Sequence, residues 1–223
     1  YRPPTTVTLD AFSSGFKQFK EEAEVNNDSA YIIPEITMEY LIVDGRLDPN
    51  DYLDRADCLC ALGYDVIISN CKNHQTLINY LADYSIGKLG LLIGVRELLS
   101  IIEEKYYNNQ DGRLLVAFGE LFNRNIKVYV YPAYFEKDAE LINAKTLMVP
   151  DGIHFLYKHL IDGHQIVQIE NYDKDLLDIM PWNVLESIEK GEDSWEIAVP
   201  KEVSQIIKEK NLFNYASKNT NIA

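Results

Sequence analysis

The stretch Leu89-Gly-Leu-Leu-Ile-Gly-Val95 is the longest apolar run in this chain of 223 residues, and it has the length of a strand. Further along, Ile126-Lys-Val-Tyr-Val-Tyr131 is rich in β-branched and aromatic residues, ends at Pro132 and predicts a second strand. Apolar residues between the two recur at helical spacing, which predicts helices from about residues 95 and 112. Alternation of this kind is typical of a parallel sheet with helices on both faces.

The same alternation extends towards the N-terminus. The expected elements are a strand over 34–43, a helix from Asp48-Pro49 to Gly63, a buried strand over 66–68 and a helix around Leu77. Three successive strand–helix units before Pro132 favour an α/β fold. Its expected form is a Rossmann-like three-layer sandwich with a mostly parallel sheet.

The segments on either side of this core follow other patterns. Residues 1–9 are expected to be extended because of two early prolines, and Asp10 to cap a helix. The second half predicts helices at about 138–147, 151–162, 173–190 and 201–210, with a short strand at 166–169. The expected organisation is therefore an N-terminal segment (1–33), an α/β core (34–132), a helical extension packed on it (133–215) and a loose tail (216–223).

Composition and charge exclude several classes of protein. The 21 Lys and Arg residues against 35 Asp and Glu residues give a formal net charge of −14, which argues against a nucleic-acid partner. No stretch reaches the roughly 18–20 apolar residues of a membrane helix, so no membrane partner is expected. The chain has three cysteines without regular spacing, which predicts reduced thiols and a cytoplasmic location. The first residue is Tyr1 rather than Met, which leaves room for an upstream domain.

No metal site is expected from the histidines and cysteines. His154, His159 and His164 stand five residues apart, whereas two ligands on one helix face need a spacing of three or four. Cys58 and Cys60 lack the two-residue spacer of common zinc sites.

Open parallel sheets bind ligands beyond the carboxyl ends of their strands, and this rule selects polar and glycine residues that follow the predicted strands. A cation and an aromatic ring near the end of the helix after residue 94 would add contacts to an anionic ligand. The candidates for ligand binding are Ser69, Asn70, Gly94, Arg96, Lys105, Tyr106 and Tyr131. An alternative is that Ser69 or Asn70 only caps the next helix. Neither Gly-x-Gly-x-x-Gly after the first strand nor Gly-x4-Gly-Lys-Ser/Thr occurs, so the common phosphate loops are excluded.

One partial match concerns Leu41-Ile-Val-Asp44-Gly-Arg-Leu47 and the strand before Ser69. Together they resemble the first two motifs of the haloacid-dehalogenase-like phosphatases. Asp44 then matches the second aspartate and Ser69 the phosphate-holding hydroxyl, while the nucleophile position is occupied by Ile42. Isoleucine cannot attack phosphorus, so this resemblance implies a degenerate, inactive member of that fold.

A second resemblance covers most of residues 35–215. The chain is similar to the C-terminal half of a bacterial family often labelled nicotinate- or nicotinamide-nucleotide adenylyltransferase, and sometimes TonB-dependent receptor. The similarity rests on Leu62–Asn70, Gly94–Leu99, Glu104–Tyr107, Phe118–Phe122, Lys127–Pro132, Trp195-Glu196, Val199-Pro200 and Ile207–Phe213. It implies fold and family membership. The nucleotidyl-transferase signature Gly-x-Phe-x-Pro-x-His-x-x-His is absent, so it implies no catalytic residue.

Two functions therefore stand open, and neither assigns a cofactor. The first is a domain that binds a nucleotide or another small anionic metabolite, linked to nucleotide metabolism. The second is a non-catalytic protein-interaction or regulatory module. The first is the leading hypothesis, and the lack of a nucleophile, a metal-binding acidic pair and a phosphate loop is the feature that favours the second.

Overall fold

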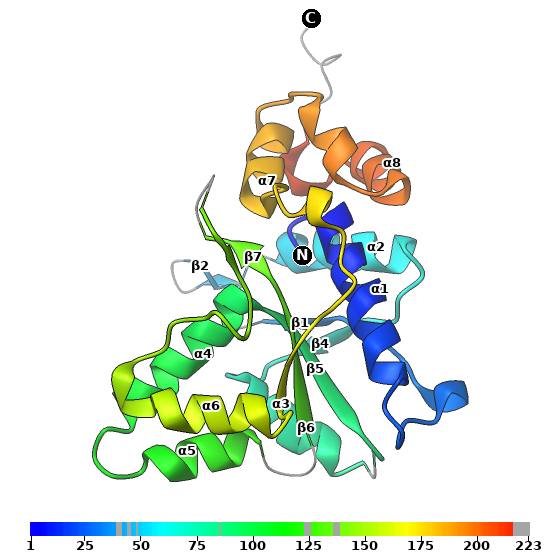
Figure 1. The fold of residues 1–223 in the computed structure, drawn as a ribbon. Coiled ribbons are helices and arrows are strands. Elements are labelled where there is room, and N and C mark those ends of the chain that lie inside the picture. Colours follow the sequence, from blue (N-terminus) through cyan, green and yellow to red (C-terminus); the bar gives the residue numbers. More distant parts are fainter. Residues whose placement is uncertain are drawn as a thin grey trace, which may run out of the picture. The chain divides into compact units, whose positions relative to one another are not determined.

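The computed structural model describes residues 1–38, 42–43, 46–47, 49–84, 86–122, 126–135 and 139–215 (Figure 1). Over these ranges the chain has a mixed α/β fold with eight α-helices and small, mostly parallel sheets. It forms two compact units. Unit 1 comprises Tyr1–Asp10, Tyr31–Leu77 and the chain from Asp178 onward, and unit 2 comprises Ala11–Ala30 and Ile78–Leu177. Both units are discontinuous in sequence, so they divide the chain differently from the contiguous ranges that the sequence suggested.

Unit 2 contains a sheet of three parallel strands in the order β5-β6-β9. These are β5 (Leu89–Gly94), β6 (Ile126–Tyr131) and β9 (Ile166–Gln168). The predicted bounds of β6 and the short strand at 166–169 are thereby confirmed. The register sets Gly94 opposite Tyr131 and Val130 opposite Gln168, so the three carboxyl ends lie at one edge of the sheet.

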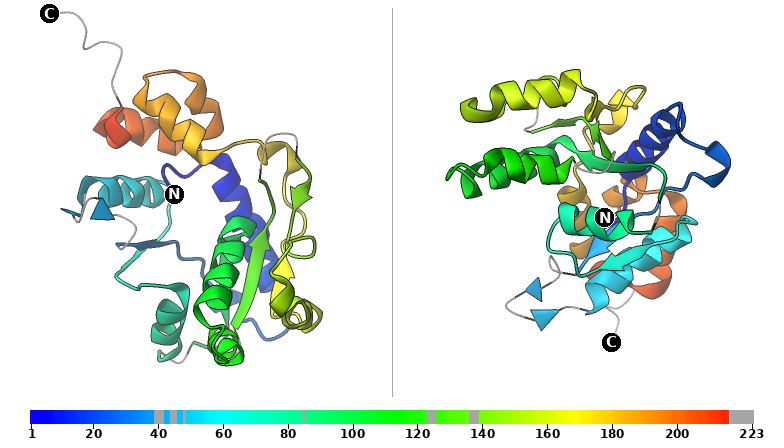
Figure 2. Two further views of the ribbon diagram at one scale, coloured as in Figure 1. Left: turned by 90° about the vertical axis from the view of Figure 1, so that its left-hand side faces the viewer. Right: turned by 90° about the horizontal axis from the view of Figure 1, so that it is seen from below.

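Helices cover both faces of this sheet. One face packs against α4 (Val95–Asn108), α5 (Leu114–Leu121) and α6 (His154–Asp162), with Val128 and Val130 in the shared core. The other face meets the C-terminal half of α1 (Thr6–Lys20), and the right-hand view of Figure 2 shows α1 opposite α4 and α6. A Cβ atom at Gly90 would lie 2.9 Å from a ring carbon of Phe19, so glycine is needed for this close approach.

A short antiparallel pair follows β6. It consists of β7 (Ala133–Tyr134) and β8 (Leu141–Ile142), so the helix predicted over 138–147 is wrong. The side-chain oxygen of Asn143 accepts hydrogen bonds from the backbone N–H of Lys145 (2.8 Å) and Thr146 (3.1 Å). Asparagine closes its own turn in this way, and the turn competes with a helix that the apolar spacing alone would favour. Residues 133–215 thus contain the strands β7 and β8 in addition to the one short strand expected among their helices.

The strands of unit 1 form two separate pairs. β1 (Glu35–Thr37) is parallel to β4 (Ile67–Ser69), and β2 (Ile42–Val43) is antiparallel to β3 (Arg46–Leu47). The single strand expected over 34–43 is therefore wrong. The described strands also do not form the one sheet expected between residues 34 and 132. Nor is β4 buried as predicted, because the side chain of Ile68 is 43% exposed.

Helices make up the rest of unit 1. α2 (Pro49–Ala61) ends before Gly63, whose φ of +84° suits glycine, and α8 (Lys201–Lys210) has the predicted bounds. The helix predicted over 173–190 is instead a 3-10 turn (Lys174–Leu176) and α7 (Pro181–Glu189), because Pro181 disfavours helical backbone at Met180. Their shared core consists of Cys58, Val184, Ile188, Trp195, Val199, Val203, Ile207, Leu212 and Phe213.

Helix α1 begins earlier than predicted, at Thr6 rather than at Asp10. The hydroxyl of Thr5 accepts a hydrogen bond from the N–H of Thr8 (3.4 Å), and the Thr8 hydroxyl accepts one from the N–H of Thr5 (3.2 Å). This reciprocal cap lies after both prolines, so they do not enter the helix. Residues 6–9 are consequently helical, not extended.

The remaining elements are short or join the two units. Helix α3 (His74–Ala82) contributes residues to both units, as α1 does. Further 3-10 turns lie at Asn27–Ser29, Asp151–Ile153, Ser194–Ala198 and Leu212–Asn214. Across the described ranges, no helix is both long and apolar enough to cross a membrane.

Candidate functional site

The carboxyl edge of the β5-β6-β9 sheet gathers three of the predicted site residues. Gly94 ends β5 and is the N-cap of α4, with φ −76° and ψ 155°. It supplies no side-chain hydrogen bond to the helix, it is exposed, and a Cβ atom placed there would meet nothing within 4 Å. Tyr131 is its partner on β6 and Arg96 lies in the first turn of α4. The start of α4 is therefore open to a ligand at the place where parallel sheets usually bind one.

Aromatic side chains surround this edge. The buried ring of Tyr131 lies edge-on to that of Tyr172, with 5.8 Å between the ring centroids. Burial raises the pKa of Tyr172, and Glu170 and Tyr134 nearby raise it further. A ring from β6 and a ring from the segment after β9 thus meet here.

Arg96 holds part of this arrangement together. Its guanidinium Nη2 donates hydrogen bonds to the backbone carbonyl of Tyr134 and to that of Phe135 (2.7 Å). The same group lies 4.9 Å from the centroid of the Phe135 ring. Arg96 therefore fastens the segment after β6 to the first turn of α4. A direct contact between Arg96 and a ligand stays a prediction.

Lys105 and Tyr106 lie elsewhere on α4. Lys105 follows Val95 by ten residues, and the helical rise of 1.5 Å per residue places it about 15 Å along the axis. Tyr106 packs against the backbone of Gly152, where a Cβ atom would lie 2.7 Å from the tyrosine oxygen. The two residues are thus not brought to the edge that contains Gly94, and their part in binding stays a prediction.

Ser69 and Asn70 belong to unit 1. The Ser69 hydroxyl donates a hydrogen bond of 2.6 Å to the Glu35 carboxylate and accepts one of 3.2 Å from the N–H of Cys71. A phosphate there would face the carboxylate of Glu35, and like charges at such distances repel. Asn70 is exposed at the end of β4. Asp44, the other residue of the phosphatase-like pattern, lies outside the described residues.

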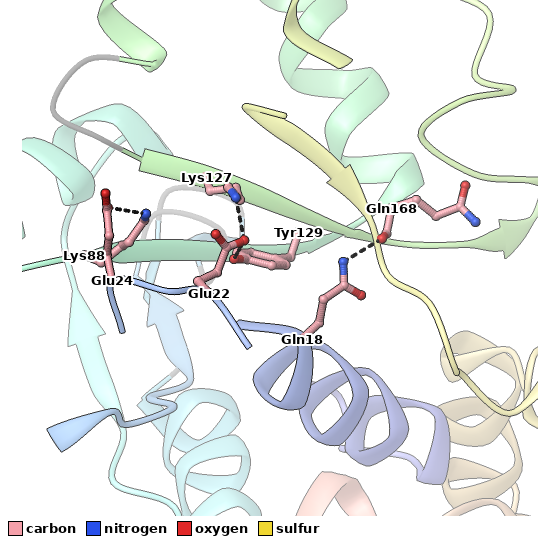
Figure 3. A network of polar contacts seen from close by, with 7 residues as sticks. All are labelled: Gln18, Glu22, Glu24, Lys88, Lys127, Tyr129 and Gln168. Carbon is pink, nitrogen blue, oxygen red and sulfur yellow. Dashed lines mark hydrogen bonds and ion pairs between the residues drawn. The ribbon is translucent and has the colours of Figure 1, made fainter. Parts of the chain in front are cut away.

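Sequence reasoning missed a polar network on the α1 side of the same sheet (Figure 3). Glu22 accepts hydrogen bonds from Lys127 and from the hydroxyl of Tyr129, the latter at 3.0 Å. Gln18 donates to the carbonyl of Gln168 and accepts from the N–H of Glu170, each at 2.9 Å. These bonds tie α1 and the residues after it to β6 and β9.

The ionisation of Glu22 follows from these contacts. Burial alone would raise the pKa of its carboxyl, but the hydrogen bonds from Lys127 and Tyr129 outweigh burial and lower it. The pKa of Tyr129 is raised by burial and by the Glu22 carboxylate. Tyr129 is buried against Phe19, with 5.9 Å between the ring centroids. Because its hydrogen bonds join α1 and the residues after it to the sheet, the network has a structural role.

Comparison with known proteins found neither a matching family model nor a matching curated protein. Within the parts of the chain that the structure describes, no group of three or more His, Cys, Asp or Glu side chains is arranged to hold a metal ion. The geometry of the sheet edge is therefore the basis on which a function is proposed.

Proposed function

We propose that unit 2 is a Rossmann-like domain that binds a small anionic metabolite with a planar ring, of the nucleotide class, at the carboxyl edge of its sheet. The observation that carries the proposal is the position of Gly94. It ends β5, begins α4 and lies opposite the buried Tyr131 in the register of the sheet. The resemblance to a family labelled as nucleotide adenylyltransferases supports the same ligand class.

Each part of the ligand has a matching feature. The first turn of α4 presents backbone N–H groups and the positive end of the helix dipole, which favour a phosphate or carboxylate. The half-buried ring of Tyr172, which packs edge-on against the buried Tyr131, offers aromatic surface to a planar group. Arg96 acts as a positioning residue, since it fixes Tyr134 and Phe135 beside this edge.

The test is a thermal-shift titration with AMP, ATP, nicotinamide mononucleotide and inorganic phosphate. A ligand present at 100 times its dissociation constant would stabilise the protein by roughly 2.7 kcal/mol. Gly94→Asp places a carboxylate where the anion would bind. Aspartate is also a good N-cap, so this variant is expected to keep the stability of the free protein, or raise it by a few tenths of a kcal/mol, while losing the ligand shift.

Gly87→Asp is the matched control, because residue 87 precedes the amino end of β5 and a Cβ atom there also meets nothing within 4 Å. It should retain the full ligand shift. The proposal fails if no compound of the panel stabilises the protein, or if Gly94→Asp binds as the unmodified chain does.

A further inference from the structure

The start of helix α4 has room for one anionic group. We call the carboxyl edge of the β5-β6-β9 sheet, where this helix begins, the ligand edge. Val95, Arg96 and Glu97 are the first three residues of α4, and Gly94 before them adds no side chain. The N–H groups of a first turn have no partner within their own helix, and together they suit one phosphate or carboxylate. A second or third phosphate would extend beyond them and depend on the side chains nearby.

Two carboxylates lie at the ligand edge. Glu97 belongs to the first turn of α4 and stands about 5 Å from Gly94 along the helix axis. Glu170 follows the end of β9 by two residues, and its charge helps to raise the pKa of Tyr172, whose ring packs against Tyr131. Because Tyr131 is also the partner of Gly94 in the sheet, this second carboxylate lies beside the same edge.

Two cations lie near these carboxylates, and both are engaged. Nη2 of Arg96 donates to the backbone carbonyl groups of Tyr134 and Phe135. Nζ of Lys145 lies 3.9 Å from the carboxylate of Glu170. The two carboxylates therefore offset both cations, while the chain as a whole has a formal net charge of −14.

We propose that the ligand edge selects nucleotides with a single phosphate over nucleoside di- and triphosphates. The inference rests on the proposed function and narrows its ligand class. One phosphate is stabilised by the N–H groups and the helix dipole at the start of α4. Each added phosphate brings more negative charge towards the carboxylates of Glu97 and Glu170, and this repulsion costs affinity.

The test is isothermal titration calorimetry of the chain with AMP, ADP and ATP, without added divalent metal. All three carry the same adenosine, so the comparison isolates the phosphates. AMP is expected to bind about threefold or more tighter than ADP and ATP at about 150 mM salt. Salt screens the repulsion, so the preference should narrow at about 500 mM salt. This salt series needs no variant and therefore tests the inference even if a variant fails to fold.

A double variant tests the two carboxylates directly. Glu97→Gln with Glu170→Gln should bring the affinity for ATP to within about twofold of that for AMP. The matched control is Glu103→Gln with Glu104→Gln, which removes the same formal charge. Both control residues are exposed and lie about 12 Å or more from Val95 along α4, beyond the Debye length at physiological salt. The control should keep the preference for AMP.

Three results would overturn the inference. If ATP binds the unmodified chain as tightly as AMP does, the ligand edge accommodates further phosphates, and the proposed function still stands. An unchanged preference in Glu97→Gln with Glu170→Gln, or an equal change in both double variants, would show that these two carboxylates do not set it. If none of the three nucleotides binds, the proposed function itself fails and the inference fails with it.

Discussion

The sheet of unit 2 and the β1–β4 pair of unit 1 obey the same local rules but differ in strand length, burial and helix cover. Both are parallel, and in each a strand leads directly or through a short loop to a helix. In the sheet of unit 2, β5 and β6 have six residues each and β9 has three; buried valines lie on β6, and helices cover both faces. The β1–β4 pair has three residues a strand and an exposed Ile68. Of the two, only the sheet of unit 2 combines an open helix start with buried aromatic rings. The rule that ligands bind beyond the carboxyl ends of parallel strands therefore indicates a site only where helices cover the sheet.

The sharpest test of this contrast is a pair of isoleucine truncations. Ile166→Ala removes a fully buried side chain from β9 and should cost about 2–5 kcal/mol of unfolding free energy. Ile68→Ala on β4 should cost less than about 1 kcal/mol, because its side chain is already hydrated. Urea unfolding followed by circular dichroism measures both. Tryptophan fluorescence adds a signal confined to unit 1, which contains both Trp182 and Trp195. Equal losses in the two variants would contradict the contrast.

A smaller effect is expected from adding a methyl group where α1 crosses β5. Gly90→Ala places a Cβ atom 2.9 Å from Phe19 and 3.0 Å from Tyr129, and this overpacking should cost about 1–3 kcal/mol. Gly87→Ala, which meets nothing within 4 Å, is the control and should be neutral or slightly stabilising. An unchanged unfolding midpoint for Gly90→Ala would show that α1 is not held against the sheet at this point.

The Glu22 network should make the stability of the protein depend on pH. The pKa of Glu22 is lower in the folded protein than the ordinary value of 4.5. Its contribution, about 1.5 kcal/mol, is therefore present above pH 4.5 and is lost as the pH falls through the folded pKa. Glu22→Gln should lower the melting temperature at pH 7, and the difference from the unmodified chain should shrink towards pH 3. A difference that is constant over this range would rule out the ionised form as the stabilising one.

The last prediction concerns the reactivity of two cysteine thiols and involves no change in stability. These thiols report the opening of unit 1 separately from that of unit 2. Burial, with Asp54 and Asp57 nearby, raises the pKa of Cys58 to about 12, so its thiol is unreactive while the helical core of unit 1 is closed. Cys60 is exposed. A thiol reagent at pH 8 should modify Cys60 first and Cys58 only when urea opens the core. Rapid modification of Cys58 in the native protein would contradict this packing.

The candidate site shows which of its features the sequence predicted and which it did not. The rule on strand ends selected Gly94, Arg96 and Tyr131, and the structure brings these three together. The same rule selected Ser69, whose hydroxyl is instead bonded to Glu35, a residue 34 positions earlier in the chain. It had no means to show that the Arg96 guanidinium is bonded to carbonyl groups 38 and 39 residues away. Contacts of this kind depend on the folded path of the chain, which local sequence patterns do not specify.

Local physics in the sequence determined where many elements begin and end. The bounds of β6, the end of α2 before Gly63 and the extent of α8 follow from apolar spacing, proline and glycine, all of which act within a few residues. The tertiary structure alone decided which strands pair, because β-pairing joins residues far apart and each strand has several suitable partners. It also decided that one side of the apolar helix α5 stays exposed in this chain, since burial depends on the surface that other elements have left to cover.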